Sequence, residues 1–166
     1  MTAAVTGEEF VAIMAAFPTG VAIVTAVDVD GTPRGLTTNA VTSVSLVPPI
    51  LLVCLDLSSR TLPAVRHSGR FVVNFMSANC EAVCRKFASK DDDKFDHVRW
   101  ERGREGVPVL VGHAVAFAEC LVRDDLEVGD HAVLTGLVEG GSPPESTGEP
   151  LLYFRRSYHP ARGTRA

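Results

Sequence analysis

The sequence is 166 residues long, with 46% hydrophobic and 22% charged residues, which is ordinary for one soluble globular domain. Its net charge of −4 argues against general nucleic-acid binding. No apolar run approaches the roughly 20 residues that a membrane helix needs, and the segment MTAAVTGEEF lacks the basic and apolar regions of a signal peptide. We therefore expect a cytoplasmic protein without a membrane or nucleic-acid partner. It should form a single domain over residues 1–166, with its core at about 10–159.

The first third of the chain predicts a helix followed by a β-hairpin. The segment Thr6–Glu9 fits a capping box, and apolar residues then recur at helical spacing over 10–17. The pair Asp30-Gly31 is a hairpin turn signal between strands expected at 21–27 and 35–46.

Strands dominate the rest of the chain. Neither Pro48 nor Pro49 can donate a backbone hydrogen bond, so the chain should break there, before an apolar run at 50–57 with the length of a central strand. The further elements expected are a short helix over 58–68, a strand over 70–76, a helix ending near Ala88 and capped by Ser77 or Asn79, a charged loop over 90–106, and strands over 107–111, 113–122, 131–139 and 151–154. Because most links are too short for parallel crossovers, we expect a mainly β fold, a closed or partly split antiparallel β-barrel with peripheral helices.

The segment 37–45, Thr-Thr-Asn-Ala-Val-Thr-Ser-Val-Ser, does not alternate cleanly between apolar and polar residues, although its neighbours are apolar. Hydroxyls and an amide would lie on both faces of this strand. Burying such groups without partners costs about 1–3 kcal/mol each. Either the strand pairs them internally, or it lays them against a polar group that is not protein.

Two further patterns indicate a phosphate-bearing planar ligand. Ser58-Ser59-Arg60-Thr61 follows an apolar strand and opens a helix, and hydroxyls and free N–H groups at a helix N-terminus favour an anion. An ordinary helix cap is the alternative. Gly129-Asp130-His131 predicts a tight turn that places the histidine at the mouth of the next strand, where histidines are also commonly structural.

Several other kinds of site are excluded or weakly indicated. The sequence has no GxGxxG after a strand, no GxxxxGK[ST], no HExxH and no GxSxG motif, which argues against a Rossmann crevice and a serine hydrolase. Cys54, Cys80, Cys84 and Cys120 lack CxxC spacing and are expected to be buried, reduced thiols. The run Asp91–Asp93 lacks the glycine and distal glutamate of a calcium loop. We expect a solvated charged loop there, and no metal site.

Seven motifs resemble, in their order and spacing, the short-chain flavin reductases, which are the reductase components of two-component flavin-dependent monooxygenases. The motifs are FPTGVAIVTA, GLTTNAVTSVSLVPPILLVCLD, SSRT, GRFVVNFM, KFASKDDDKF, VGDHAVLTGLVE and PLLYFRRSYH. They run from about Phe17 to Tyr158, which is most of the chain. The resemblance implies an FMN-binding split β-barrel, related to flavin-binding oxidases, and a homodimer.

The resemblance also implies roles for individual residues. Those expected at the flavin's ribityl chain and ring are Thr37, Thr38, Asn39 and Ala40, and those expected at the isoalloxazine edge are Ser43, Val44 and Ser45. The residues expected to hold the phosphate are Ser59 and Thr61, together with Ser58 and Arg60, while Phe87 and Ala88 would flank the distal part of the cofactor. The residues expected to approach the nicotinamide are His131, the catalytic candidate, and Tyr158.

The implied activity is NAD(P)H:flavin oxidoreduction. Hydride would pass from NADH or NADPH to FMN or FAD, and the reduced flavin would leave for a partner monooxygenase. Because cofactors carry this chemistry, the protein would supply stacking, orientation and electrostatics. Two alternatives remain open from the sequence. One is a flavin-bound oxidase or reductase of the same fold that acts on another small molecule, and the other is a flavin- or haem-binding module without turnover.

Overall fold

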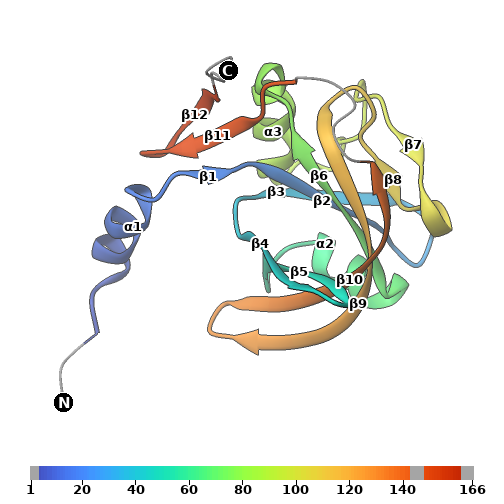
Figure 1. Ribbon diagram of the computed structural model, residues 1–166, viewed down its shortest axis with the longest axis horizontal. Helices are drawn as coiled ribbons and strands as arrows, with labels where there is room; N and C mark the ends of the chain where they lie inside the picture. Colours follow the sequence, from blue (N-terminus) through green and yellow to red (C-terminus); the bar gives the residue numbers. More distant parts are fainter. Residues whose placement is uncertain (1–3, 143–147, 162–166) are drawn as a thin grey trace.

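The computed structural model describes residues 4–142 and 148–161. Its centre is a curved seven-stranded sheet with the order β3-β2-β6-β9-β10-β5-β4, in which all neighbours are antiparallel (Figure 1). The strands are β2 (Ala22–Val27), β3 (Pro33–Thr38), β4 (Val41–Leu46), β5 (Pro49–Asp56), β6 (Arg70–Met76), β9 (Ala114–Val128) and β10 (His131–Ser142). The edge strands β3 and β4 are consecutive in the chain, yet no pairing joins them within the described residues. The predicted antiparallel β fold is confirmed, and among the described residues the sheet stays open between these two edge strands.

Smaller elements surround the sheet. A three-stranded sheet contains β1 (Thr19–Gly20), β11 (Leu151–Phe154) and β12 (Ser157–Pro160), and a two-stranded ribbon contains β7 (Glu101–Arg102) and β8 (Pro108–Val109). The helices are α1 (Gly7–Ala15), α2 (Thr61–Ser68) and α3 (Glu81–Ala88), with short 3₁₀ turns η1 (Ala78–Cys80) and η2 (Arg104–Gly106).

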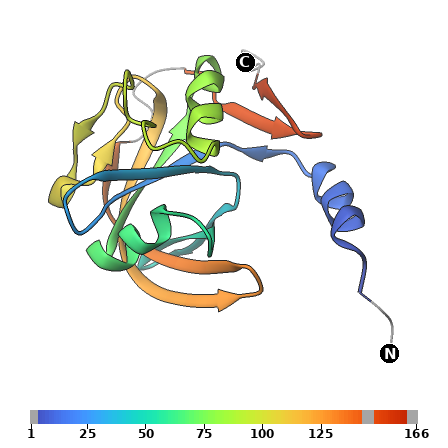
Figure 2. The same ribbon diagram turned by 180° about the vertical axis from the view of Figure 1, so that it is seen from behind.

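Two of the helices pack on either side of the β2–β3 hairpin (Figure 2). Leu62 and Val65 of α2 are buried in a cluster with Val24 of β2. Phe87 of α3 is buried in a second cluster with Ile23, the neighbour of Val24 on the opposite face of the strand. Burial on both faces explains why β2 is a run of apolar and β-branched residues.

The polar segment is two strands rather than the single strand expected over 35–46. The break lies at Asn39 and Ala40, between β3, which pairs with β2, and β4, which pairs with β5. The Thr38 hydroxyl accepts a hydrogen bond from the Ala40 N–H at 3.1 Å. A side-chain hydroxyl that accepts from a nearby backbone N–H can replace a hydrogen bond between strands. At this point the chain passes from one edge of the sheet to the other.

The N-terminal helix forms as predicted but adds nothing to the core. Thr6 and Glu9 make the reciprocal hydrogen bonds of a capping box. None of the residues of α1 is buried, and the side chains of Phe10 and Ile13 are 55% and 58% exposed. Figure 1 shows the helix projecting from the body of the molecule. No helix in the described ranges is long and apolar enough to cross a membrane.

Other expectations are corrected in detail. Neither Ser77 nor Asn79 caps a helix through its side chain, because the Ser77 hydroxyl donates to the Asn79 side chain at 2.5 Å and a 3₁₀ turn precedes α3. The strands expected at 113–122 and 131–139 are longer, since β9 and β10 pair along most of their length. The cysteines are free, and all are buried except the half-buried Cys54.

Candidate functional site

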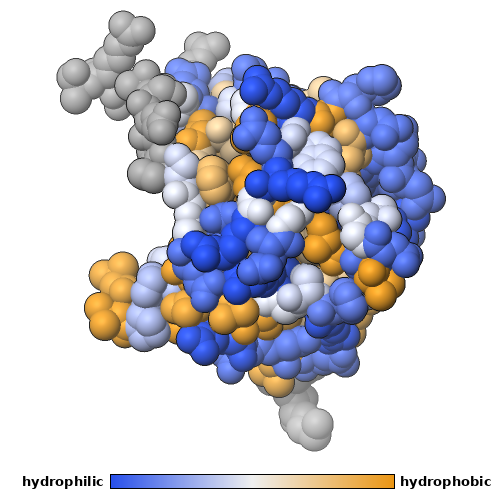
Figure 3. All heavy atoms as spheres, turned by 90° about the vertical axis from the view of Figure 1, so that its right-hand side faces the viewer, coloured by the Kyte–Doolittle hydropathy of each residue, from blue (hydrophilic) through white to orange (hydrophobic). Residues whose placement is uncertain are grey.

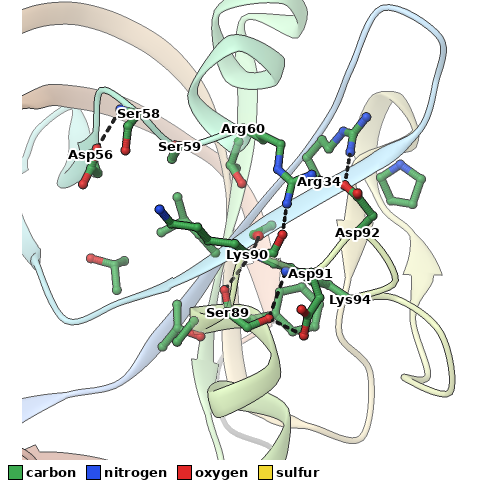
Figure 4. A pocket seen from close by; sticks show the side chains of 18 of the residues that line it. Arg34, Asp56, Ser58, Ser59, Arg60, Ser89, Lys90, Asp91, Asp92 and Lys94 are labelled. Atoms are coloured by element: carbon green, nitrogen blue, oxygen red, sulfur yellow. Dashed lines mark hydrogen bonds and ion pairs between the residues drawn. The ribbon is translucent and has the colours of Figure 1, made fainter.

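A polar cleft of about 570 Å³ lies between β3, the end of β5, the N-terminus of α2 and the loop that follows α3 (Figure 4). It thus lies beside β3, one of the two edge strands of the large sheet. The residues predicted from the sequence that line it are Thr37, Thr38, Ser58, Ser59, Arg60, Thr61, Phe87, Ala88 and His131. These side chains come from five elements, and the fold brings all of them to one cavity.

An apolar groove of about 820 Å³ adjoins the polar cleft. Its walls are β4, β5 and the segment from Met14 to Ala22, which ends α1 and enters β2. The predicted ligand contacts that line it are Asn39, Ala40, Ser43 and Ser45. Cys54 of β5 lines both cavities, so the two lie side by side along this strand.

Two of the predicted residues line neither cavity. Val44 is 54% exposed on β4. Tyr158 of β12 packs against Tyr153, with ring centroids 5.2 Å apart, and the Arg85 guanidinium lies 5.0 Å from its ring centre. The structure does not bring Tyr158 to the cleft that His131 lines, so its nicotinamide contact stays a prediction.

The threonines of the polar segment are partly paired within the protein. The Thr37 hydroxyl donates to the Cys84 carbonyl at 2.7 Å, and the Thr38 hydroxyl holds the Ala40 N–H. No hydrogen bond of the two serine hydroxyls of β4 is found among the described residues. Hydrogen bonds within the protein thus explain the threonines of β3, whereas the serine hydroxyls of β4 stay available to a ligand in the apolar groove.

The N-terminus of α2 is organised as an anion site would be. Ser59 Oγ accepts from the Leu62 N–H at 3.1 Å, so its own proton is free to donate outward. The Ser58 N–H donates to Asp56 Oδ1 at 2.6 Å. Hydrogen bonds from Ser58 lower the pKa of Asp56, and the charges of His131 and Lys90 act in the same direction. Helix N–H groups, a hydroxyl and the adjoining Arg60 are well suited to hold a phosphate.

His131 begins β10, directly opposite Asp56 of β5, and is half-buried. Its Nδ1 lies 2.7 Å from Asp130 Oδ1, and this contact lowers the pKa of Asp130. An ionised carboxylate only accepts, so Nδ1 carries the proton of this bond. Asp130 therefore contacts the ring of a histidine at the mouth of the cleft from the solvent side.

Sequence reasoning misses three cations of the cleft, Arg34, Lys90 and Lys94. Lys94 Nζ donates to the carbonyls of Phe87, at 3.0 Å, and Gly35, at 3.2 Å, and burial together with the charge of Arg60 lowers its pKa. The charged run expected to be a solvated loop is thus a wall of the cleft. Lys90 and Lys94 lie in the charged run that begins soon after Phe87 and Ala88, and this proximity in the sequence is the signal that could have found them. Nothing in the sequence marks Arg34.

The chain was compared with known proteins. A family model described as "Flavin reductase like domain" matches residues 14–162. Flavin reductase (NADH) of Kitasatospora aureofaciens is 46% identical over 155 residues, which are 93% of this chain and 81% of that protein. Flavin reductase (NADPH) of Lentzea aerocolonigenes is 45% identical over 93% of this chain and 89% of its own length.

A solved structure gives the same result. The styrene monooxygenase flavin reductase of Pseudomonas putida S12 superposes with a TM-score of 0.84 at 31% identity, over 93% of this chain and 98% of that one. The identities, the coverage and the shared fold agree with the assignment reached from the motifs. The chain belongs to the flavin reductase-like domain family, and its assignment as an NAD(P)H-dependent flavin reductase is confirmed.

Proposed function

We propose that flavin lies along the surface shared by the two cavities, with its phosphate in the polar cleft and its ring on the apolar groove. The observation that carries this proposal is that the two cavities adjoin at Cys54, with the N-terminus of α2 lining one and the serines of β4 lining the other. When bound, flavin supplies the acceptor for the hydride of NADH or NADPH.

The residues present fit such a ligand. At the phosphate end, the Ser59 hydroxyl, the α2 N–H groups and Arg60 offer donors and positive charge. At the ring end, Ala40, Ile50 and Leu52 offer apolar surface, while the serines of β4 offer donors and acceptors for the polar edge of the ring. FMN and FAD share these groups, so either fits.

The test of turnover is NADH oxidation at 340 nm with and without added FMN or FAD. We expect little oxidation by the protein alone and strong oxidation when flavin is added. A protein that binds flavin and consumes neither NADH nor NADPH would be a binding module, and the proposed reaction would then be wrong.

His131 is proposed to position the nicotinamide rather than the flavin. We expect His131→Ala to lower kcat/KM for NADH by about 10–100-fold, the effect of losing an orienting contact of about 1.5–3 kcal/mol. Flavin affinity should change less than about threefold. Titration with flavin, followed by steady-state kinetics with varied NADH, separates the two effects. The matched control is His67→Ala, because His67 is exposed on α2 and lines neither cavity. Equal losses for both ligands would contradict the assigned role.

We also propose that the reduced flavin is handed to a separate monooxygenase. The similar protein of Pseudomonas putida is named as the flavin reductase of a styrene monooxygenase. Release of the flavin requires a site that is open to solvent. The walls of the polar cleft meet this requirement, because they include the exposed residues Ser58, Arg60 and Ala88. Flavin would then behave as a substrate that leaves after each turnover.

A homodimer is proposed from the apolar surface at one end of the molecule. Besides α1, the turn between β4 and β5 exposes Leu46 at 87% and Val47 at 92%. Large exposed apolar patches mark interaction surfaces. By contrast, hydrophilic side chains predominate on the side that carries β7 and β8 (Figure 3). Light scattering should give twice the chain mass of 17.7 kDa, and a monomer at micromolar concentration would contradict the proposal.

The remaining expectations are proposed as well. The chain would be one domain with its core at about 10–159, since the family model spans 14–162 without interruption. The free cysteines of the described residues fit the reducing cytoplasm.

A further inference from the structure

Asp92 is the carboxylate of the polar cleft that faces its arginines. It forms an ion pair and a hydrogen bond with Arg60, and its Oδ1 lies 4.0 Å from Arg34 Nη1. Figure 4 shows the three side chains converging at one end of the cleft. The other carboxylates that line the cleft have different partners, Asp91 with Ser89 and Asp56 with Ser58.

The cations around Asp92 are held in place by other contacts. Arg34 is anchored by Asp28, to which its Nε and Nη2 each lie at 2.9 Å. Arg60 also donates to the Lys90 carbonyl. Lys94 is tied to two backbone carbonyls. If Asp92 moved away, these groups would keep their positions and leave a preformed site for another anion.

The contact with Asp92 is weak enough to exchange. The side chains of Asp92 and Arg60 are 78% and 50% exposed, and ion pairs between exposed groups contribute little. A phosphate carries more charge and more acceptor oxygens than a carboxylate, so its bonds to arginine are stronger. The same two arginines cannot bind both anions at full strength.

We propose that Asp92 is an affinity-determining residue, an internal anion that occupies the place of the ligand phosphate beside Arg60 and Arg34. This inference rests on the proposed placement of the flavin phosphate. Binding of the ligand displaces the Asp92 carboxylate, and return of the carboxylate promotes release. A reductase that must give up its product each turnover gains a faster exit by this competition.

The test compares Asp92→Asn with Asp93→Asn. Both remove one negative charge from the same loop, but Asp93 pairs with Lys86 at 3.5 Å and does not line the cleft. In fluorescence titrations, Asp92→Asn should tighten FMN binding about two- to fivefold, chiefly through slower release measured by stopped flow. Riboflavin, which lacks the phosphate, should bind equally well to both variants and to the wild-type protein.

An Arg60→Ala background separates displacement from general electrostatics. If Asp92 acts chiefly by competing for Arg60, then the difference between Asp92→Asn and Asp93→Asn should shrink once Arg60 is absent, leaving only the part that acts through Arg34. The inference would be overturned if Asp92→Asn tightened riboflavin binding as much as FMN binding, or if the two aspartate variants changed FMN affinity equally. If Arg60→Ala did not weaken FMN binding, the proposed placement of the phosphate would be contradicted instead. The failure of the Asp92 inference and the failure of the proposed function therefore give different results.

Discussion

Replacing Arg60 with alanine is expected to weaken the binding of FMN about 10–100-fold. The side chain stands at the N-terminus of α2 beside Ser59, where charge-assisted hydrogen bonds to a phosphate contribute about 1.5–3 kcal/mol. Riboflavin has no phosphate, so its affinity should not change. Quenching of flavin fluorescence measures both dissociation constants under the same conditions.

The matched control is Arg66→Ala, which removes an arginine from the same helix. Arg66 lines neither cavity and is bound instead to Asp125, at 2.7 Å, and Glu127, at 2.9 Å, on β9. Its replacement should leave FMN affinity within about twofold of the wild-type value. If Arg60→Ala weakened the binding of riboflavin as much as that of FMN, the loss of affinity would not come from a phosphate contact.

Replacing Asn74 with leucine is expected to destabilise the protein by about 3 kcal/mol or more. Asn74 is fully buried in β6, where its side chain accepts from the Leu110 N–H at 2.8 Å and donates to the Ile23 carbonyl at 3.0 Å and to Thr25 Oγ1 at 3.3 Å. Leucine fills a similar volume but leaves the buried Leu110 N–H without its acceptor and removes the bond to the Ile23 carbonyl, whereas Thr25 keeps its bond to the Pro108 carbonyl. Each buried group that loses its partner costs about 1–3 kcal/mol.

Denaturant unfolding monitored by circular dichroism measures this loss, and the thermal midpoint should fall by about 10 °C. The control is Asn79→Leu, because Asn79 is exposed and water can replace its hydrogen bonds. We expect it to change the free energy of unfolding by less than about 0.5 kcal/mol. Equal stability of the Asn74 variant and the wild type would show that this network does not hold β6, β2 and the segment before β9 together.

Local patterns predict most of the fold correctly. The apolar run of β5, the Asp30-Gly31 turn, the capping box at Thr6 and the left-handed Gly69 that ends α2 are each decided by neighbours in the chain. The part of the cleft proposed to hold the phosphate is predictable for the same reason, since Ser58 to Thr61 are consecutive and lie at one helix N-terminus.

Features set by distant parts of the chain are not predictable in this way. The break in the polar segment depends on which edge of the sheet each half joins. Local sequence does not contain this information, so the single strand predicted over 35–46 is wrong. The contact of Asp92 with Arg60 joins residues 32 positions apart, and an aspartate-rich run alone indicates only a solvated loop.

The apolar face of α1 shows a third limit. Its residues recur at helical spacing, which ordinarily indicates packing against the core of the same chain. In the structure none of them is buried, and Met14 and nearby Phe17 line the apolar groove instead. Periodicity identifies a face that must be covered, but it does not say by what.

A crystal structure of the protein with FMN tests the central claim most directly. We expect phosphate oxygens within hydrogen-bonding distance of Ser59 Oγ and the Arg60 guanidinium, and an isoalloxazine ring against Ala40 and the serines of β4. A phosphate bound away from the N-terminus of α2, or a ring that does not touch β4, would contradict it.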